Sequence, residues 1–185
     1  AIASHDSADL AAGVLGGTPG YTMANVDSVD VVVRGQGGHG AAPHTTKDPI
    51  VLASAIVGKL QTIVSREQDP TDPAVVTVGS FRAGSTHNII PDEARLQITV
   101  RSYSDETRKR ILDTIGRVAK GEAIASGIAE DDMPQVSWNE DYTRSTYNTP
   151  ELAESMLAAF RDRFGSERVK CSSRRWWVRI SANTI

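Results

Sequence analysis

The sequence has few of the features that would assign it to a membrane, secreted or disulfide-rich class. Among its 185 residues there is one cysteine, Cys171, which excludes an internal disulfide and is typical of a reducing compartment. No apolar run approaches the roughly 20 residues that a transmembrane helix needs, and no N-terminal segment has the basic head and apolar core of a signal peptide. We therefore predict a cytoplasmic protein without membrane contact. The first residue is not methionine, which indicates that the natural start lies upstream.

A strong charge of either sign is also absent. The chain has 20 Lys and Arg against 23 Asp and Glu, a formal net charge of −3, and the two signs are interspersed. A nucleic-acid-binding protein usually gathers basic residues on one face, so this balance disfavours a nucleic-acid partner. The short motifs HExxH, CxxC, GxSxG and the P-loop are missing as well. The stretch "GQGGHG" lacks the following helix start that a dinucleotide-binding fingerprint requires.

What is present is a regular pattern of strands and helices. Apolar spacing predicts a helix from Pro49 to about Arg66, with Asp48 as its N-cap. A second helix is predicted after Ser102, with Ser102 as the cap and Asp105 three residues later. Strands are predicted at 27–35, 74–81, 94–103 and 133–140. The order βαββαβ predicts an α+β, ferredoxin-like domain, in which a four-stranded antiparallel sheet carries both helices on one face.

The segments on either side of this set differ from it. Residues 1–25 are rich in Ala and Gly and are predicted to be loop. A further helix is predicted at 147–165 and, because it follows the complete βαββαβ set, it should belong to another layer. Its apolar stripe has a spacing of four residues and consists of Leu152, Met156, Phe160 and Phe164.

The side chains that could carry chemistry lie in loops and at one strand end. The candidates are His5, His39, His44, His87, Asn88 and Arg101. Taken singly, each has an ordinary structural explanation as an exposed turn or strand residue. Taken together, the guanidinium of Arg101 and the amide of Asn88 suit a carboxylate, and the imidazole of His39 suits negative charge that develops on an oxygen. The set predicts a unit that clamps a substrate but has no nucleophile, metal cage or base of its own.

Two long segments make the sequence resemble a known family. They are "VDSVDVVVRGQGGHGAAPHTTKDPIVLASAIVGKLQ", which contains the glycine-rich loop, and "THNIIPDEARLQITVRSYSDETRKRI". Both are similar to the lid, or dimerisation, domain of the two-metal amidohydrolases and peptidases. That family includes hippurate hydrolase, N-acyl-amino-acid amidohydrolases, aminoacylases and glutamate carboxypeptidases. The resemblance runs from about His5 to Gly165 and implies a βαββαβ lid inserted in a larger, metal-binding catalytic domain.

The resemblance implies a role for each matching residue. His39 matches the lid histidine that reaches across the dimer to polarise the scissile carbonyl. Asn88 and Arg101 match the residues that hold the substrate, Arg101 at its carboxylate. His5 matches a metal ligand that precedes the crossing to the lid, although the residue before it is not the bulky apolar one of the relatives. His44 also matches a family position, which we interpret as structural.

The resemblance further implies an incomplete enzyme. Intact relatives bind two divalent metal ions (Zn, Mn or Co), but the upstream metal ligands and catalytic Glu pair are missing from this sequence. We expect residues 1–25 to be a remnant of the catalytic domain, 26–143 to be the lid, and 144–185 to be a returning catalytic segment. We expect the fragment to form a homodimer through the lid and to clamp a small N-acyl amino acid substrate. By itself it should bind no metal tightly and catalyse nothing.

A second interpretation stays open, in which the chain is a stand-alone dimerisation or binding module without catalysis. A nucleic-acid-binding module would need aromatic side chains on the central strands. Those strands have Thr77, Gly79, Gln97 and Thr99 instead. Pure dimerisation is therefore the alternative to an enzyme fragment.

The C-terminal stretch "SSRRWWVRISANTI" resembles no segment of the family. Tryptophan has one codon, so Trp176–Trp177 fixes TGGTGG. Read two bases later, the permitted codons of the tail can spell P-P-M-V-G-E-D-F-G-E-Y, which reproduces the family's "PPVMGGEDF" segment near the active site. We interpret the tail from about residue 172 as the product of a frameshift; the alternative is a tail that has truly diverged.

The frameshift makes a prediction about the gene. The DNA that encodes residues 172–185 will read as a Gly-Glu-Asp-Phe segment when the frame is moved by two bases, because the amino acids before and after the double tryptophan permit it. Sequencing this stretch, together with the corresponding stretch of a relative with an intact frame, checks the prediction. Codons that give no such segment in either shifted frame would contradict it.

Overall fold

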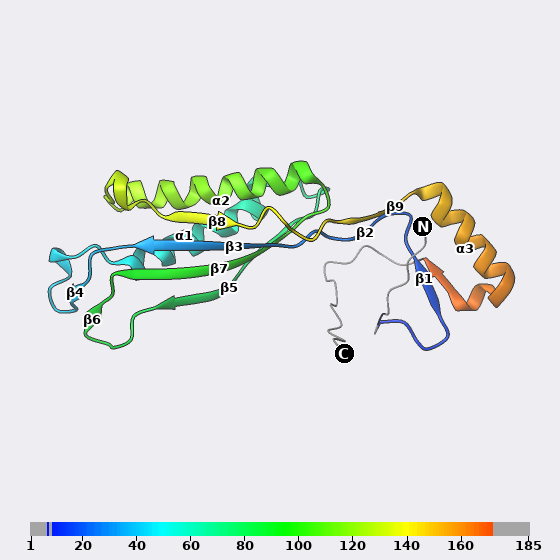
Figure 1. Cartoon of the computed structure of the whole chain (residues 1–185), viewed down its shortest axis with the longest axis horizontal. Coiled ribbons are helices and arrows are strands. Elements are labelled where there is room, and N and C mark those ends of the chain that lie inside the picture. Colours follow the sequence, from blue (N-terminus) through cyan, green and yellow to red (C-terminus); the bar gives the residue numbers. More distant parts are fainter. Residues whose placement is uncertain (1–6, 8, 172–185) are drawn as a thin grey trace. The chain divides into compact units, whose positions relative to one another are not determined.

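The computed structural model describes residues 7 and 9–171, which form two compact units (Figure 1). The larger unit is Asn25–Arg144, and the smaller one is formed by the residues that precede and follow it. His5 and the tail from residue 172, with its double tryptophan, lie outside the described residues. Within the described residues, no helix is long and apolar enough to cross a membrane.

The larger unit has the βαββαβ order that the sequence predicts. Its antiparallel sheet has the strand order β5 (Val75–Ala83), β7 (Glu93–Arg101), β3 (Asp27–Arg34) and β8 (Gln135–Trp138). Helices α1 (Pro49–Thr62) and α2 (Asp105–Ala125) lie on one face of this sheet (Figure 1). The predicted fold class is confirmed, and the strand ends differ from the predicted ones by up to two residues.

Alternation in the two central strands decides which face the helices cover. In β3, Val29, Val31 and Val33 are at most 1% exposed, while the alternating positions Ser28 and Asp30 are exposed. Full burial of one such side chain stabilises the fold by roughly 1.5–3 kcal/mol. The buried partners are Leu96, Ile98 and Val100 of β7, Leu52, Ile56 and Leu60 of α1, and Ile111, Ile115 and Val118 of α2.

Helix α1 begins as predicted. Asp48 Oδ1 accepts a hydrogen bond from the amide of Ile50 at 2.8 Å, and Pro49 is the first helical residue. The helix ends earlier than predicted, because a turn of π-helix (Ile63–Glu67) follows Thr62.

Helix α2 begins two residues later than predicted. Ser104 is its N-cap, and the Ser104 hydroxyl accepts a hydrogen bond from the amide of Thr107 at 3.1 Å. The prediction of Ser102 as the cap was wrong, because Ser102 is fully buried and its amide donates to the side chain of Asn25 at 2.6 Å.

The part of the smaller unit that the structure describes contains four short strands. The prediction of loop throughout residues 1–25 was wrong, because the partners of its two strands come from the far end of the chain and local composition cannot reveal them. The pairs are β1 (Leu15–Gly17) parallel to β10 (Val169–Cys171) and β2 (Gly20–Met23) antiparallel to β9 (Thr146–Asn148).

Helix α3 (Pro150–Phe164) occupies its predicted place but buries a different residue from the predicted stripe. Leu152 and Phe164 are 52% and 46% exposed, whereas Leu157 is buried. A Cβ at Gly17 would lie 2.8 Å from Leu157 Cδ2, so the glycine lets the leucine approach. Three single turns of 3₁₀-helix lie at Pro43–Thr45, Glu130–Asp132 and Ser166–Arg168.

Candidate functional site

His39 and Asn88, which come from different predicted loops, lie together at one end of the larger unit. Strand β4 (Gly38–His39) pairs with β6 (Ile89–Ile90) in an antiparallel ribbon. The amide of Gly40 donates a hydrogen bond to the carbonyl of Asn88 at 2.8 Å. Figure 1 shows this ribbon at the end of the sheet where β3 ends and β7 begins. We call residues 37–42 and 88–92 the tip ribbon.

The glycines of the tip ribbon make room for its second strand. A Cβ at Gly37 would lie 2.6 Å from the carbonyl oxygen of Ile90, and one at Gly40 would lie 3.1 Å from that of Asn88. Neither glycine has a positive φ, so close approach of two backbones is the reason for glycine here. The amide of Gly37 also donates to Asp92 Oδ1 at 2.8 Å. The segment that contains His39 is therefore held at several points.

The imidazole of His39 is exposed but has a fixed backbone partner. Its Nδ1 accepts a hydrogen bond from the amide of Ala41 at 3.1 Å. The amide of Ala42 donates to the carbonyl of His39 at 2.8 Å and closes a tight turn. Within the described residues nothing bonds to Nε2, which can therefore meet a ligand.

Asn88 is exposed in the same way. Its Oδ1 accepts a hydrogen bond from the hydroxyl of Thr86 at 3.2 Å. The side-chain nitrogen, which can only donate, has no partner in the part of the chain that the structure describes. His87 and His44 are both exposed, His44 on the 3₁₀ turn that follows the tip ribbon.

Arg101 lies at the opposite end of the sheet from the tip ribbon. It is the last residue of β7, opposite Val75, whereas Glu93 at the start of β7 pairs with Arg34 near the tip ribbon. A strand that rises roughly 3.3 Å per residue separates these two ends by about 26 Å. The structure thus brings His39 and Asn88 together and leaves Arg101, which is half-buried, at a distance from both.

The described residues do not form a metal centre. No group of three or more His, Cys, Asp or Glu among them could hold a metal ion, and His5, the predicted ligand, lies outside them. A catalytic zinc site generally uses three protein ligands. These residues therefore do not fit such a site by themselves.

A buried polar cluster near Arg101 was not predicted from the sequence. The fully buried carboxylate of Asp27 accepts hydrogen bonds from Arg108 Nε at 3.0 Å and from Arg108 Nη2 at 2.7 Å. The hydrogen bond with Asp27 raises the pKa of Arg108 above its ordinary value. The guanidinium carbon lies 3.6 Å from the centre of the Tyr142 ring. The one signal for this cluster in the sequence was Asp27, an acidic residue at the start of a run of β-branched residues.

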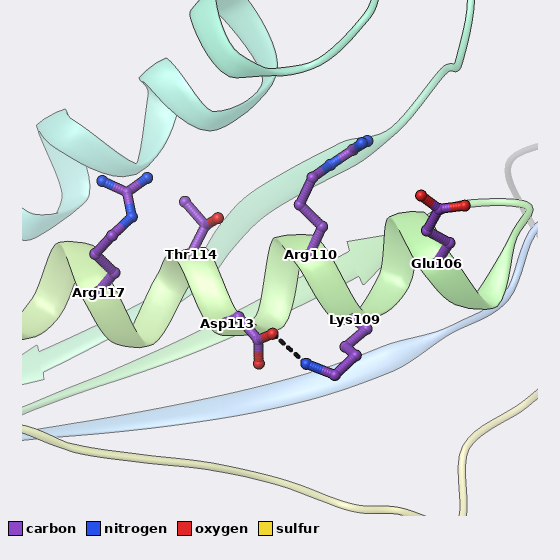
Figure 2. Close-up of a pocket in the computed structure, with 6 residues that line it drawn as sticks. All are labelled: Glu106, Lys109, Arg110, Asp113, Thr114 and Arg117. Atoms are coloured by element: carbon purple, nitrogen blue, oxygen red, sulfur yellow. Dashed lines mark hydrogen bonds and ion pairs between the residues drawn. The ribbon is translucent and has the colours of Figure 1, made fainter.

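A shallow hollow on the described surface lies elsewhere. It has a volume of about 400 Å³ and lies over the outer side of α2 (Figure 2). Several of its charged groups already have partners: Lys109 pairs with Asp113 at 2.5 Å and Arg117 pairs with Glu67 at 2.5 Å. Its lining contains none of the predicted site residues, so it does not mark the functional site. The lining consists of Glu106, Lys109, Arg110, Asp113, Thr114 and Arg117.

Comparison with models of known families finds one match, which covers most of the larger unit and the few residues before it. Residues 21–126, more than half of the chain, match the peptidase dimerisation domain of the M20 family. The chain belongs to this M20 dimerisation-domain family. His39, Asn88 and Arg101 all lie within the matched M20 segment, whereas α3 and β10 lie outside it.

Relatives in the M20 family are longer than this chain. Hippurate hydrolase of Campylobacter jejuni is 38% identical over 156 residues, which are 84% of this chain and 39% of the relative. N-acetyldiaminopimelate deacetylase of Bacillus subtilis is 36% identical over 156 residues, 84% of this chain and 40% of the relative. A dinuclear metal-binding M20 peptidase of Bacillus subtilis has a similar structure, with a TM-score of 0.68 and 28% identity over 94% of this chain and 41% of that one. The chain spans about two fifths of these relatives.

The tip ribbon makes a prediction about Gly40. Gly40→Ala places a Cβ 3.1 Å from the Asn88 carbonyl, so the ribbon must shift and we expect a loss of roughly 1–3 kcal/mol in the free energy of unfolding. The Gly40 amide should also exchange its hydrogen faster. Urea unfolding and hydrogen exchange measure the two effects.

The matched control is Gly121→Ala in α2, where nothing lies within 4 Å of the added Cβ. That variant should gain roughly 0.5–1 kcal/mol, since alanine is the better helix former. Equal stability changes in the two variants would contradict the close approach at Gly40.

Proposed function

We propose that the chain supplies the lid of a metal-dependent hydrolase that cleaves amide bonds of N-acyl amino acids or similar small substrates. The observation that carries the proposal is the exposed pair His39 and Asn88 on one ribbon of a chain that is 38% identical to a hippurate hydrolase. In this proposal residues 26–143 are the lid, and residues 1–25 and 144–185 belong to the catalytic domain.

The lid residues would act on charge that develops during hydrolysis. Attack on the amide carbonyl places negative charge on its oxygen, and a donor aimed at that oxygen stabilises the transition state more than the ground state. His39 Nε2 is the donor that we propose. The free amide nitrogen of Asn88 would hold the substrate beside it, and Arg101 would bind the substrate carboxylate with its planar guanidinium.

The water that attacks would come from a metal centre of the intact enzyme. The solved M20 peptidase of Bacillus subtilis is a dinuclear metal-binding protein, and we propose two divalent ions, with Zn, Mn and Co as the candidates. The described residues cannot form that centre. Their part in the reaction is to bind and orient the substrate and to stabilise charge.

The length of β7 indicates that one protomer cannot supply all three lid residues to one substrate. Arg101 is separated from the tip ribbon by about 26 Å along the strand. An N-acyl amino acid has the length of about two extended residues, roughly 7 Å. We therefore propose that each site takes His39 and Asn88 from one protomer and Arg101 from the other.

A dimer through β5 would produce this combination. Strand β5 is an edge of the sheet, and its outer hydrogen-bonding groups can pair with another chain. Antiparallel pairing of two β5 strands around a two-fold axis places Ala83 of one copy near Val75 of the other, so each tip ribbon approaches the partner's Arg101 end. Helix α1 packs against β5 and β7 and exposes Val51 (66%), Ser54, Ala55 and Gly58, side chains small enough for close contact.

The alternative function, a dimerisation module without catalysis, would keep this interface. It is favoured by one observation, namely that the described residues do not fit a metal centre. It differs from the hydrolase proposal in assigning no chemistry to His39 and Arg101, so the two are separated by the effect of these residues on turnover.

The proposed arrangement predicts complementation between two variants. In an intact enzyme with this lid, His39→Ala should lower kcat by roughly 10²–10³, the usual loss for one oxyanion donor. Arg101→Ala should mainly raise KM for substrates with a free carboxylate. A mixed dimer of the two has one site with both defects and one site with neither. With substrate well below KM, where both parent variants are slow, about a quarter of the wild-type activity should return after equal mixing and subunit exchange.

The control is a mixture of His39→Ala with Asn88→Ala, whose defects both come from the tip ribbon. Every site of that mixed dimer has one defect, so its activity should stay low. If the mixture of His39→Ala and Arg101→Ala also stays inactive while exchange is demonstrated, the two residues do not act from different protomers.

The proposed interface predicts a change in oligomeric state. Val51→Glu would bury a carboxylate without a partner, and we expect the dimer to weaken by at least about 100-fold, because an unpaired buried charge costs several kcal/mol. Sedimentation velocity of the chain across a range of concentrations measures this. Ile124→Glu, an equally exposed apolar residue on α2 (59%), should dimerise like the wild type. Dimers of equal affinity in both variants would contradict the interface.

A further inference from the structure

The three backbone amides that follow His39 each donate one hydrogen bond to a defined acceptor. The Gly40 amide donates to the carbonyl of Asn88 at 2.8 Å, and the Ala42 amide donates to the carbonyl of His39 at 2.8 Å. The Ala41 amide, between them, donates to the Nδ1 atom of His39 at 3.1 Å. The first two bonds hold the turn in place, so the third is aimed at the ring by the backbone rather than by a mobile side chain.

This third bond decides where the proton of the ring lies. A neutral imidazole has one protonated nitrogen and one that accepts, and the partner of one nitrogen sets the state of the other. A backbone amide can only donate. Nδ1 must therefore be the accepting nitrogen, and the proton of neutral His39 lies on Nε2.

We propose that the amide of Ala41 fixes His39 as an Nε2–H donor before any substrate binds, with Ala41 as a positioning residue. The inference rests on the proposed function, in which Nε2 faces the substrate oxygen, and it assigns that nitrogen a role. A histidine that acts as a base commonly donates its Nδ1–H to a carboxylate or carbonyl and offers an unprotonated Nε2. At His39 the two nitrogens have the opposite roles, because Nδ1 accepts and Nε2 carries the hydrogen. Nε2 of neutral His39 is therefore a hydrogen-bond donor and not a proton acceptor.

Gly37 and Gly40 of the tip ribbon help to hold the turn that orients His39. A side chain at Gly40 would come within 3.1 Å of the carbonyl that accepts the Gly40 amide. The carboxylate of Asp92 holds the amide of Gly37 at 2.8 Å on the other side of His39. The turn is therefore constrained before and after the histidine. A donor that is oriented in advance loses less free energy to reorganisation when charge develops on the substrate.

Nuclear magnetic resonance of the chain as it exists tests this directly. In a sample with ¹⁵N-labelled histidine at about pH 9, where ordinary histidines are neutral, long-range ¹H–¹⁵N spectra report which ring nitrogen is protonated. We expect His39 to show an unprotonated Nδ1 and a protonated Nε2, with a scalar coupling between Nδ1 and the Ala41 amide. His44 and His87, which are exposed, are the internal references and should show a mixture of both forms.

Two variants separate the backbone donor from the side chain. Ala41→Pro removes the amide hydrogen, and the His39 signals should move to the mixture seen for the references. Ala41→Gly keeps the amide and should keep the Nε2–H form. The coupling in the unmodified chain is decisive even if the proline variant does not fold. Absence of the coupling, or a His39 mixture equal to that of His44, would overturn the inference.

The outcome does not depend on the proposed function, because no substrate or metal is present. If the coupling is found and His39→Ala leaves turnover of an intact enzyme unchanged, the proposed function fails and the fixed ring remains. If turnover falls but the ring shows both forms equally, the inference fails and the function remains.

Discussion

The antiparallel pairing of β3 with β7 determines where every candidate residue lies. Its register runs from Asp27 opposite Val100 to Arg34 opposite Glu93. A slip by one residue would turn the buried side chains of β7 towards solvent, so burial against the two helices holds the register. Because the tip ribbon follows β3 and precedes β7, the same pairing brings His39 and Asn88 together from loops that are 49 residues apart.

The two ends of this central pair have different chemistry. The tip ribbon carries the exposed side chains of His39 and Asn88 and is held by backbone hydrogen bonds and by close approaches that require glycine. The other end is anchored by the buried pair of Asp27 and Arg108, and by Asn25 and Ser102, which share two side-chain hydrogen bonds. Removal of one partner from a buried ion pair costs about 3–5 kcal/mol. Arg101 is therefore placed by a rigid base, and His39 by a ribbon that extends from the sheet.

The sequence predicted what depends on local pattern and missed what depends on distant partners. Alternation identified the strands correctly, and the Asp48–Pro49 pair identified the start of α1. Six short strands gave no periodicity and were not predicted, namely β1, β2, β4, β6, β9 and β10. Ser102 and Ser104 are equivalent as caps in the sequence. Only the burial of Ser102 against Asn25 distinguishes them. The sequence also did not reveal that the glycines around His39 allow close contact between the two backbones of the tip ribbon.

The separation of His39 from Arg101 has a consequence for how such a lid is used. A rigid sheet cannot bend its two ends onto one small substrate, because the bend would break the β3–β7 ladder and uncover the core. Two copies related by a two-fold axis solve this without deformation, since antiparallel edge pairing brings the tip of one beside the base of the other. In such an arrangement a single protomer contains both His39 and Arg101, but the two residues lie at opposite ends of its sheet. Each therefore belongs to a different substrate site, which the partner protomer completes. In the proposed function, dimerisation therefore belongs to the chemistry of the site and not only to its stability.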